Sequence, residues 1–284
     1  LVFAKSHIEL FKKQDSLYTS FLRSAGLRLK TGESNLLEKS MAESQLFELR
    51  NRQVQNEADI RILEKRMQTL LHSDDEVSTT EAKLAPLPLD IRKDSGATKA
   101  NPALEYFSNQ IQLNEANIRL EKARLWPDLS VGYFNQSLYG TIDYRNTGLV
   151  AGSGKRFQGF SLGLAVPLWR KPQMARIQYS EAQKKAAQSQ LELNRKNLDG
   201  QYAQATQEYL KWKNSLAYFE NTALPTAKTI NESALKSFKA GNIGYIEFLQ
   251  GVNRAVLVET EYLNQLNQYN QSILQIEFLI GNPQ

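Results

Sequence analysis

Few side chains of this sequence combine a reactive type with a spacing that could support catalysis or metal binding. Its 284 residues include two histidines, three methionines and no cysteine. His7 and His72 lie far apart, and Met41, Met67 and Met174 are spaced like ordinary packing or surface residues. Soft metal ions need clustered methionine, cysteine or histidine ligands, so we expect neither a designed metal site nor a cofactor.

The residue patterns of common enzymes are missing as well. The sequence contains no Ser-His-Asp arrangement and no carboxylate pair with supporting geometry. Residues Gly152 to Lys155 have the composition of a phosphate-binding loop, but they lack the strand, loop and helix spacing that such a loop requires. We therefore expect a protein that is not an enzyme.

Two glutamates, Glu38 and Glu247, stand out because they occupy matching places in an internal repeat. The offset is the 209 residues that separate Gly32 from Gly241, and each glutamate follows its glycine by six residues. The aligned residues are Lys30, Thr31, Gly32 and Glu33 in one copy and Lys239, Ala240, Gly241 and Asn242 in the other. Few identities support this alignment, so two unrelated helices that each follow a glycine are the alternative to a tandem repeat.

Charge and hydropathy argue against two classes of protein. The net charge of +5 is spread thinly among acids and amides, whereas nucleic-acid binding needs a concentrated basic face. No nucleic-acid partner is therefore expected. The mean hydropathy is −0.48, and no apolar run reaches the 18 or so residues of a transmembrane helix.

Apolar spacing in the first repeat predicts long helices with narrow apolar seams. A helical hairpin is expected over 1–72, with its first helix over 1–25 and a break between Gly26 and Asn35. Residues 73–100 are expected to form a linker, because prolines and an Asp-Ser-Gly turn interrupt the helical pattern there.

The second repeat is expected to fill residues 101–284. Asn101 and Pro102 form a typical helix start. A long helix is expected over 172–240 and a final helix over 244–280, where apolar gaps of three, four and seven indicate coiled-coil-like packing. The predicted fold class is mainly α, with long helical hairpins.

A two-stranded antiparallel β-hairpin is expected over 128–168, because apolar and small residues alternate there with a period of two. The apolar positions are Leu129, Val131, Tyr133, Phe160, Leu162, Leu164 and Val166. Each run has the ~9–11 residues that a tilted strand needs to cross a bilayer. A soluble hairpin packed on helices is the alternative, but the glycine-rich loop over 140–159 is long for one.

Several short motifs, in this order and spacing, resemble the TolC-like outer-membrane efflux channels over essentially the whole chain. They are Arg124-Leu125-Trp126-Pro127-Asp128-Leu129, Val166-Pro167-Leu168-Trp169, Phe238-Lys239-Ala240-Gly241, Ile246-Glu247-Phe248-Leu249 and Leu279-Ile280-Gly281. The sequence is most similar in style to the heavy-metal (Cus/Czc-like) branch of that family.

The resemblance implies a homotrimer in the outer membrane of a Gram-negative bacterium. Each repeat would give one strand hairpin to a shared transmembrane β-barrel in outer-membrane lipid and one helical hairpin to a periplasmic tunnel. Small solutes or metal ions would pass through passively, while a partner inner-membrane pump of the RND type, joined by a periplasmic adaptor protein, supplies the energy. The apolar strand positions would then face lipid.

The resemblance also implies roles for the repeat residues. Glu247 matches a position where the family often places an acid that narrows the tunnel entrance, Gln250 matches a second one, and Glu38 is the counterpart in the first repeat. Three copies of Glu247 would favour cations; the alternative is an ordinary solvated helix surface. The turns 30–33 and 239–242 would form the tunnel tips and contact the adaptor.

Two departures from the family pattern lie near the second turn. Phe238 has no hydroxyl group for a gate-locking hydrogen bond, and Ile243 stands where some members have an arginine. The turn triplets also differ from the Val-Gly-Leu sequence associated with adaptor docking. A gating network of the best-known type is therefore not expected.

The main alternative is a soluble periplasmic coiled-coil adaptor or scaffold protein with no pore. Adaptors surround their helical hairpin with lipoyl-like and barrel domains, for which this sequence lacks the short Gly- and Val-rich strands. The sequence starts at Leu1 with no signal-peptide pattern, and the repeat aligns Leu1 with Leu210. We therefore expect a processed protein or a piece of a larger one, whose counterpart of residues 101–209 lies outside this sequence.

Overall fold

The computed structural model describes residues 1–79, 83–89, 97–137, 140–141, 150–151 and 156–281. They form two compact units, the first made of residues 1–98 and 200–284 and the second of residues 99–199. None of the helices within these described ranges is long and apolar enough to cross a membrane. The Gly152 to Lys155 segment and the Asp94-Ser95-Gly96 turn lie outside the described residues.

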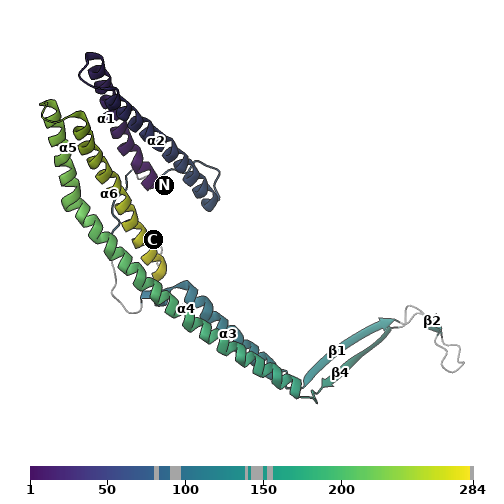
Figure 1. The fold of residues 1–284 in the computed structure, drawn as a ribbon. Helices are drawn as coiled ribbons and strands as arrows, with labels where there is room; N and C mark the ends of the chain where they lie inside the picture. Colours follow the sequence, from purple (N-terminus) through teal and green to yellow (C-terminus); the bar gives the residue numbers. More distant parts are fainter. Residues whose placement is uncertain (80–82, 90–96, 138–139, 142–149, 152–155, 282–284) are drawn as a thin grey trace. The chain divides into compact units, whose positions relative to one another are not determined.

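The first unit begins with the antiparallel hairpin of α1 (Val2–Thr31) and α2 (Leu36–Leu71) (Figure 1). Helix α1 extends past the break expected at Gly26, because a glycine inside a helix costs only about 1 kcal/mol. It ends instead at Gly32, whose φ of 79° is the left-handed conformation that glycine adopts readily. The backbone N–H of Glu33 then donates to the carbonyl of Arg28 at 2.9 Å.

The second hairpin, α5 (Leu224–Lys239) and α6 (Tyr245–Ile280), turns in the same way. Gly241 has a φ of 75°, and the backbone N–H of Asn242 donates to the carbonyl of Ser237 at 2.9 Å. The two turns therefore have the same backbone geometry 209 residues apart.

The long helix expected over 172–240 is helical along its length but has one irregular turn. It consists of α4 (Lys171–Tyr218), the π-helical turn η2 (Phe219–Ala223) and α5. Pro225, the second residue of α5, has no N–H to donate to the preceding turn. A wider turn before a proline accommodates the missing bond, so the helix continues rather than ends.

The core of the first unit joins the two hairpins. Its buried members come from α1, α2 and α6 and are Tyr18, Phe21, Ala25, Ala42, Leu46, Leu49, Tyr245, Phe248, Leu249 and Val252. Phe248 packs edge-on against Phe21, with ring centroids 4.9 Å apart, and stacks on Phe238 at 4.6 Å. Helix α6 therefore packs against α5 and against the α1–α2 hairpin.

Part of the expected linker crosses the first unit as an extended strap. The backbone N–H of Leu84 donates to Ser6 of α1 at 2.8 Å. The buried amide of Asn270 in α6 accepts from the N–H of Leu87 at 2.9 Å and donates to the carbonyl of Ala85 at 2.8 Å. Residues 83–89 are thus bound to both hairpins.

The second unit contains α3 (Pro102–Ala123) and the first part of α4, which run alongside each other (Figure 1). The short 3-10 helix η1 (Ala97–Ala100) precedes α3, and Asn101 caps α3 as expected by accepting from the N–H of Ala103. Polar contacts join the two helices, including Lys184 to Glu115 at 2.8 Å. No residue of α3 is buried.

Strands β1 (Asp128–Ser137) and β4 (Arg156–Ala165) pair antiparallel, from Asp128 opposite Ala165 to Ser137 opposite Arg156. Two-residue strands β2 (Gly140–Thr141) and β3 (Val150–Ala151) form a second short ladder. Strand β4 begins within the loop expected over 140–159 and ends before Val166. Gly159 permits the early start, because a Cβ there would lie 2.9 Å from the ring of Phe134.

Candidate functional site

The β1–β4 strand pair places the predicted apolar residues directly opposite one another. The cross-strand pairs are Leu129 with Leu164, Val131 with Leu162, and Tyr133 with Phe160. The rings of Tyr133 and Phe160 lie 5.3 Å apart. All six side chains therefore share one face of the ladder, since side chains in register project to the same side.

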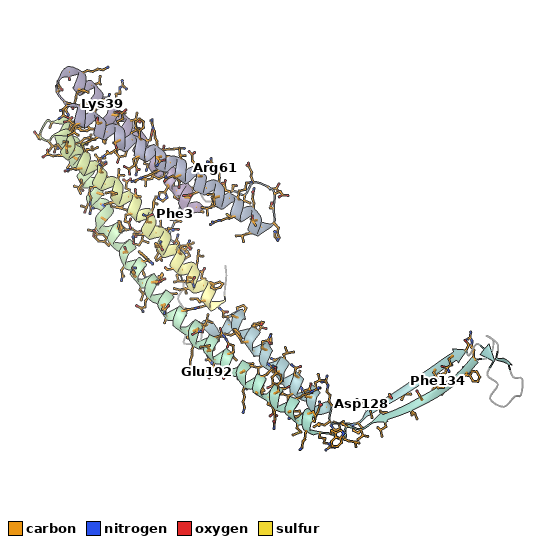
Figure 2. All side chains as sticks on the ribbon, turned by 45° about the vertical axis from the view of Figure 1, so that its right-hand side comes forward. Phe3, Lys39, Arg61, Asp128, Phe134 and Glu192 are labelled. Atoms are coloured by element: carbon orange, nitrogen blue, oxygen red, sulfur yellow. The ribbon has the colours of Figure 1, made fainter. Side chains whose placement is uncertain are left out.

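This apolar face is uncovered within its unit. Each of the six side chains is at least 57% exposed, and Val166, just beyond β4, is also exposed. The strands between the labelled Asp128 and Phe134 extend away from the helices of the unit (Figure 2). A contiguous exposed apolar surface marks a contact with lipid or with another protein.

The opposite face of the same strands is small and polar at its middle pairs, and it carries the half-exposed rings of Phe134 and Phe157 further along the strands. Its middle pairs are Ser130 with Gly163 and Gly132 with Ser161. Each serine hydroxyl group lies over the facing glycine, where an added Cβ would lie only 2.5 or 2.7 Å away. These small middle pairs cannot fill a hydrophobic core, so at these positions the ladder has one apolar side and one side suited to water.

At the tip of the first hairpin, Glu38 is held by neighbours rather than projecting freely. Its carboxylate accepts a hydrogen bond from Ser34 at 2.6 Å and lies 4.0 Å from the guanidinium group of Arg28. Its backbone N–H donates to Asn35, the N-cap of α2, at 3.0 Å. Only 15% of the Glu38 side chain is accessible, so it is the less available of the two repeat glutamates.

At the tip of the second hairpin, Glu247 is exposed and caps its helix. Its carboxylate accepts from the backbone N–H of Gly244 at 3.0 Å, as the third-position glutamate of a capping box does. Gln250, one turn further along α6, is also exposed. The sequence offered either a pore charge or a plain surface charge for Glu247; the structure adds a capping role.

Arg28 and Tyr245 connect the two tips. The guanidinium carbon of Arg28 lies 5.5 Å from the ring centroid of Phe238, within range of a cation–π contact. Burial raises the pKa of Tyr245 to about 12, and the negative charge of Glu38 adds to the shift. The Tyr245 hydroxyl group is buried with no hydrogen-bond partner among the described residues.

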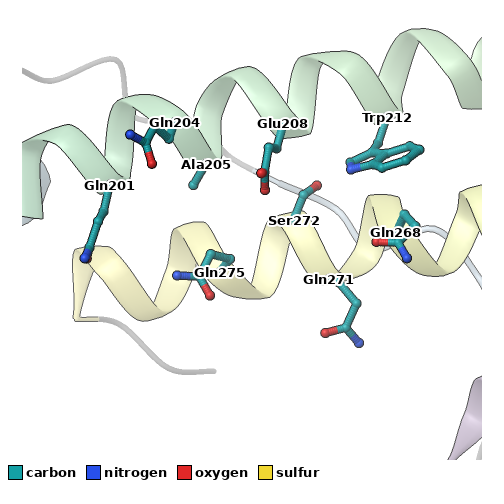
Figure 3. Close-up of a pocket in the computed structure, with 9 residues that line it drawn as sticks. All are labelled: Gln201, Gln204, Ala205, Glu208, Trp212, Gln268, Gln271, Ser272 and Gln275. Carbon is teal, nitrogen blue, oxygen red and sulfur yellow. The ribbon is translucent and has the colours of Figure 1, made fainter.

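A polar groove in the first unit, which the sequence did not single out, lies between α4 and α6 (Figure 3). Its volume is about 330 Å³, and its lining is Gln201, Gln204, Ala205, Glu208, Trp212, Gln268, Gln271, Ser272 and Gln275. Glutamine at an interval of three residues on α4, and at intervals of three and four residues on α6, was the available signal. With one carboxylate and no histidine, the groove suits water or polar solutes rather than a bound metal ion.

The described part of the chain has no candidate metal site, because it contains no group of three or more His, Asp or Glu side chains able to hold an ion. The tip residues 30–33 and 239–242 are exposed, and both sets lie at hairpin ends. The hydrogen bonds between Asn270 and the backbone of Ala85 and Leu87 were not predicted. A single asparagine in a helical pattern carries no signal of a distant partner.

Comparison with protein families gives a match over residues 95–282 to the family described as outer membrane efflux protein. This match agrees with an efflux function and with the expectation that the chain is not an enzyme. A comparison with curated protein sequences gave no match.

Solved structures share the fold at low sequence identity. A membrane protein from Pseudomonas aeruginosa has a TM-score of 0.79 at 17% identity, covering 98% of this chain and 64% of its own. The CusC protein, described as forming a transmembrane channel, has a TM-score of 0.78 at 16% identity, covering 99% and 65%. The outer membrane protein VceC from Vibrio cholerae has 0.77 at 12%, covering 99% and 66%.

These neighbours confirm the mainly helical fold with its two-stranded antiparallel sheet. The chain spans just under two thirds of the length of each of the three. CusC stands beside other outer-membrane channels such as OprN and CmeC at similar identity, so the heavy-metal branch stays a prediction.

Proposed function

We propose that this chain, which belongs to the outer membrane efflux protein family, is part of an outer-membrane channel through which solutes leave the cell. Three copies assemble so that the β1–β4 pairs contribute to a shared transmembrane barrel and the helices to a periplasmic duct. A barrel closes its own backbone hydrogen bonds, which is what allows strands to lie in lipid.

The two-sided strand pair is the observation that carries this proposal. Three aligned apolar pairs lie on one side, while serine and glycine form the middle pairs of the other, with Phe134 and Phe157 beyond them. Strands of a membrane barrel alternate between lipid-facing apolar and lumen-facing polar residues in this way. Leu129, Val131, Tyr133, Phe160, Leu162, Leu164 and Val166 are accordingly the lipid-facing residues.

Transport through such a duct is passive, so energy comes from partners. We propose an inner-membrane pump of the RND type and a periplasmic adaptor protein, with small solutes or metal ions as cargo. The adaptor would contact the exposed tips at Lys30–Glu33 and Lys239–Asn242. The amide-lined groove between α4 and α6 fits a wall that faces a water-filled path, because glutamine amides both donate and accept hydrogen bonds.

Glu247 is the better candidate for a pore charge than Glu38, because it is exposed while Glu38 is engaged by Ser34 and Arg28. Three copies of Glu247, with Gln250 nearby, would favour cations at the tunnel entrance. Glu247→Gln retains the capping geometry but removes the charge. We expect it to reduce the cation preference of reconstituted channels; an unchanged preference removes Glu247 from the pore.

Charging the apolar face tests the main proposal. Leu162→Asp combined with Leu164→Asp places two carboxylates on the face where lipid is expected, and the cost of such a charge rises with its depth in the bilayer. We expect the variant to leave the membrane fraction while its helical circular dichroism is unchanged. The matched control is Ser130→Asp with Ser161→Asp, which puts two carboxylates on the other face of the same strands and should insert normally.

An unchanged membrane fraction for the Leu162 and Leu164 variant contradicts the lipid-facing assignment. The alternative, a soluble periplasmic coiled-coil adaptor or scaffold protein, predicts that the wild-type chain is a soluble monomer without detergent. Size-exclusion chromatography with light scattering distinguishes that monomer from a detergent-dependent trimer.

A further inference from the structure

Two exposed tryptophans flank the helix-side end of the strand pair. Trp126 lies two residues before β1 and Trp169 lies four residues after β4. The Asp128–Ala165 pair is the last pair of the ladder at this end, so both indoles lie beside the same end of the strand pair. They are 76% and 85% exposed, which leaves both indole rings without a packing surface in their unit.

The tryptophans stand where the apolar face begins. Leu129 and Leu164, the first apolar pair, follow directly after the pair that closes the ladder. An indole has an apolar body and one N–H donor, and it therefore favours the boundary between hydrocarbon and water. A tryptophan on each strand connection at one end of an apolar face indicates the level at which that boundary lies.

The charges at this end are mainly basic. Arg170 and Lys171 follow Trp169 directly, are exposed, and have no ion pair among the described residues. On the other connection, Arg124 pairs with Glu121 at 2.8 Å. Asp128 is the one further acidic residue at this end of the strands. Arg170 and Lys171 together outnumber it, so this end carries a net positive charge.

We propose that Trp126, Trp169, Arg170 and Lys171 form a collar that binds anionic phospholipid headgroups at the helix-side surface of the membrane. The indoles lie at the level of the headgroups, and the two cations contact lipid phosphate groups. Anionic lipid attracts each basic residue near the surface with about a fivefold gain in affinity. The collar rests on the proposed function, since it requires β1 and β4 to lie in lipid.

Tryptophan quenching by brominated lipids tests the depth of the collar. The chain has three tryptophans, so Trp212→Phe leaves only the two of the collar. In vesicles containing phosphatidylglycerol, we expect lipid brominated near the headgroup to quench them roughly twofold more than lipid brominated near the chain ends. Trp126→Phe with Trp169→Phe leaves Trp212 of the first unit as a matched control, which neither lipid should quench.

A deep reporter separates failure of the collar from failure of the proposed function. Leu162→Trp in a chain whose three native tryptophans are phenylalanine should be quenched more by the chain-end bromines. If this reporter is quenched but Trp126 and Trp169 are not, or are quenched more by the chain-end bromines, the collar is wrong and the membrane strands stand. If no reporter is quenched, both proposals fall.

The double variant Arg170→Gln with Lys171→Gln tests the role of the two cations in a vesicle-binding experiment. We expect this double variant to lose the preference for phosphatidylglycerol over phosphatidylcholine vesicles by on the order of tenfold or more. Arg195→Gln, an exposed arginine further along α4, is the control and should keep the preference. Equal loss in the control, or no loss in the double variant, overturns the role of the two cations.

Discussion

The α1–α2 and α5–α6 hairpins share a turn but not a packing environment. Gly32 and Gly241 have nearly the same φ, and the bonds that close each turn have the same length of 2.9 Å. Yet Leu36, one residue into α2, is 66% exposed, while its counterpart Tyr245, one residue into α6, is 1% exposed. Matching backbones therefore carry side chains with opposite burial.

The difference continues along the first turns of the two helices. Phe248, Leu249 and Val252 of α6 are buried in the core, whereas the residues at the matching places of α2 are Lys39, Ser40 and Glu43. Helix α6 packs against α5 on one side and α1 on the other, so it needs a broad apolar surface. Helix α2 packs mainly against α1 and leaves Phe47, Val54 and Ile62 exposed.

The comparison teaches that the two copies keep the residues that the turn backbone requires, while the residues that pack around the turn are free to differ. A left-handed turn accepts few residues other than glycine, whatever surrounds it. The residue types on the helix surfaces after the turn depend on what packs against them. They therefore differ when one helix lies inside the unit and the other at its edge.

The largest expected effect breaks the packing of only one copy. Phe248→Ala removes a ring that contacts both Phe21 and Phe238, and we expect it to lower the free energy of unfolding by about 3–5 kcal/mol. Lys39→Ala, at the matching place of α2, should change it by less than about 0.5 kcal/mol. Urea unfolding monitored by circular dichroism measures both, and similar losses would show that the hairpins pack alike.

A pH experiment addresses the buried phenol of Tyr245, whose counterpart in the first copy is Leu36. The pKa of Tyr245 is raised to about 12 by burial, while the phenol of an unfolded chain ionises near pH 10. The folded state holds its proton more tightly, so this stabilisation is complete below pH 10 and is lost between about pH 10 and 12. The urea midpoint should fall less over that window in Tyr245→Phe than in wild type or in Tyr106→Phe, an exposed control.

The turn glycines should behave alike, which tests the similarity rather than the difference. Gly32→Ala and Gly241→Ala each force a Cβ into the left-handed region, where no neighbouring atom lies within 4 Å. Backbone strain alone should then cost about 1–2 kcal/mol in each case. Losses that differ by more than about 1 kcal/mol would show that the two turns are not equivalent.

The smallest expected effects come from the helix caps, which differ between the copies. Asn35→Ala removes the acceptor for the N–H of Glu38 and should cost about 1 kcal/mol. Glu247→Ala should cost a similar amount, whereas Glu247→Gln should cost less because its amide oxygen still accepts from Gly244. Gly244→Asn gives α6 the cap of α2 and should stabilise it by a few tenths of a kcal/mol. Thermal melts rank these variants.

Several features followed from local sequence because their cause is local. The period of two over Phe160 to Leu164 determined which side chains share a face, and the strand register then paired them as expected. Asn101 and Pro102 began a helix because an N-cap and a first-turn proline act on their own backbone. The end of α1 was misplaced at Gly26, since a glycine inside a helix has the same sequence signal as the glycine that ends it.

The sequence by itself determined the helical hairpins, the two strands with their apolar face, and the family, since all depend on residue periodicity and short motifs. Only the tertiary structure decided that Glu38 lies against Arg28 across the turn and that Asn270 binds the extended strap. These outcomes depend on which backbone and side-chain groups meet in space. A glutamate or an asparagine has the same pattern in sequence whether its partner is water or a distant helix.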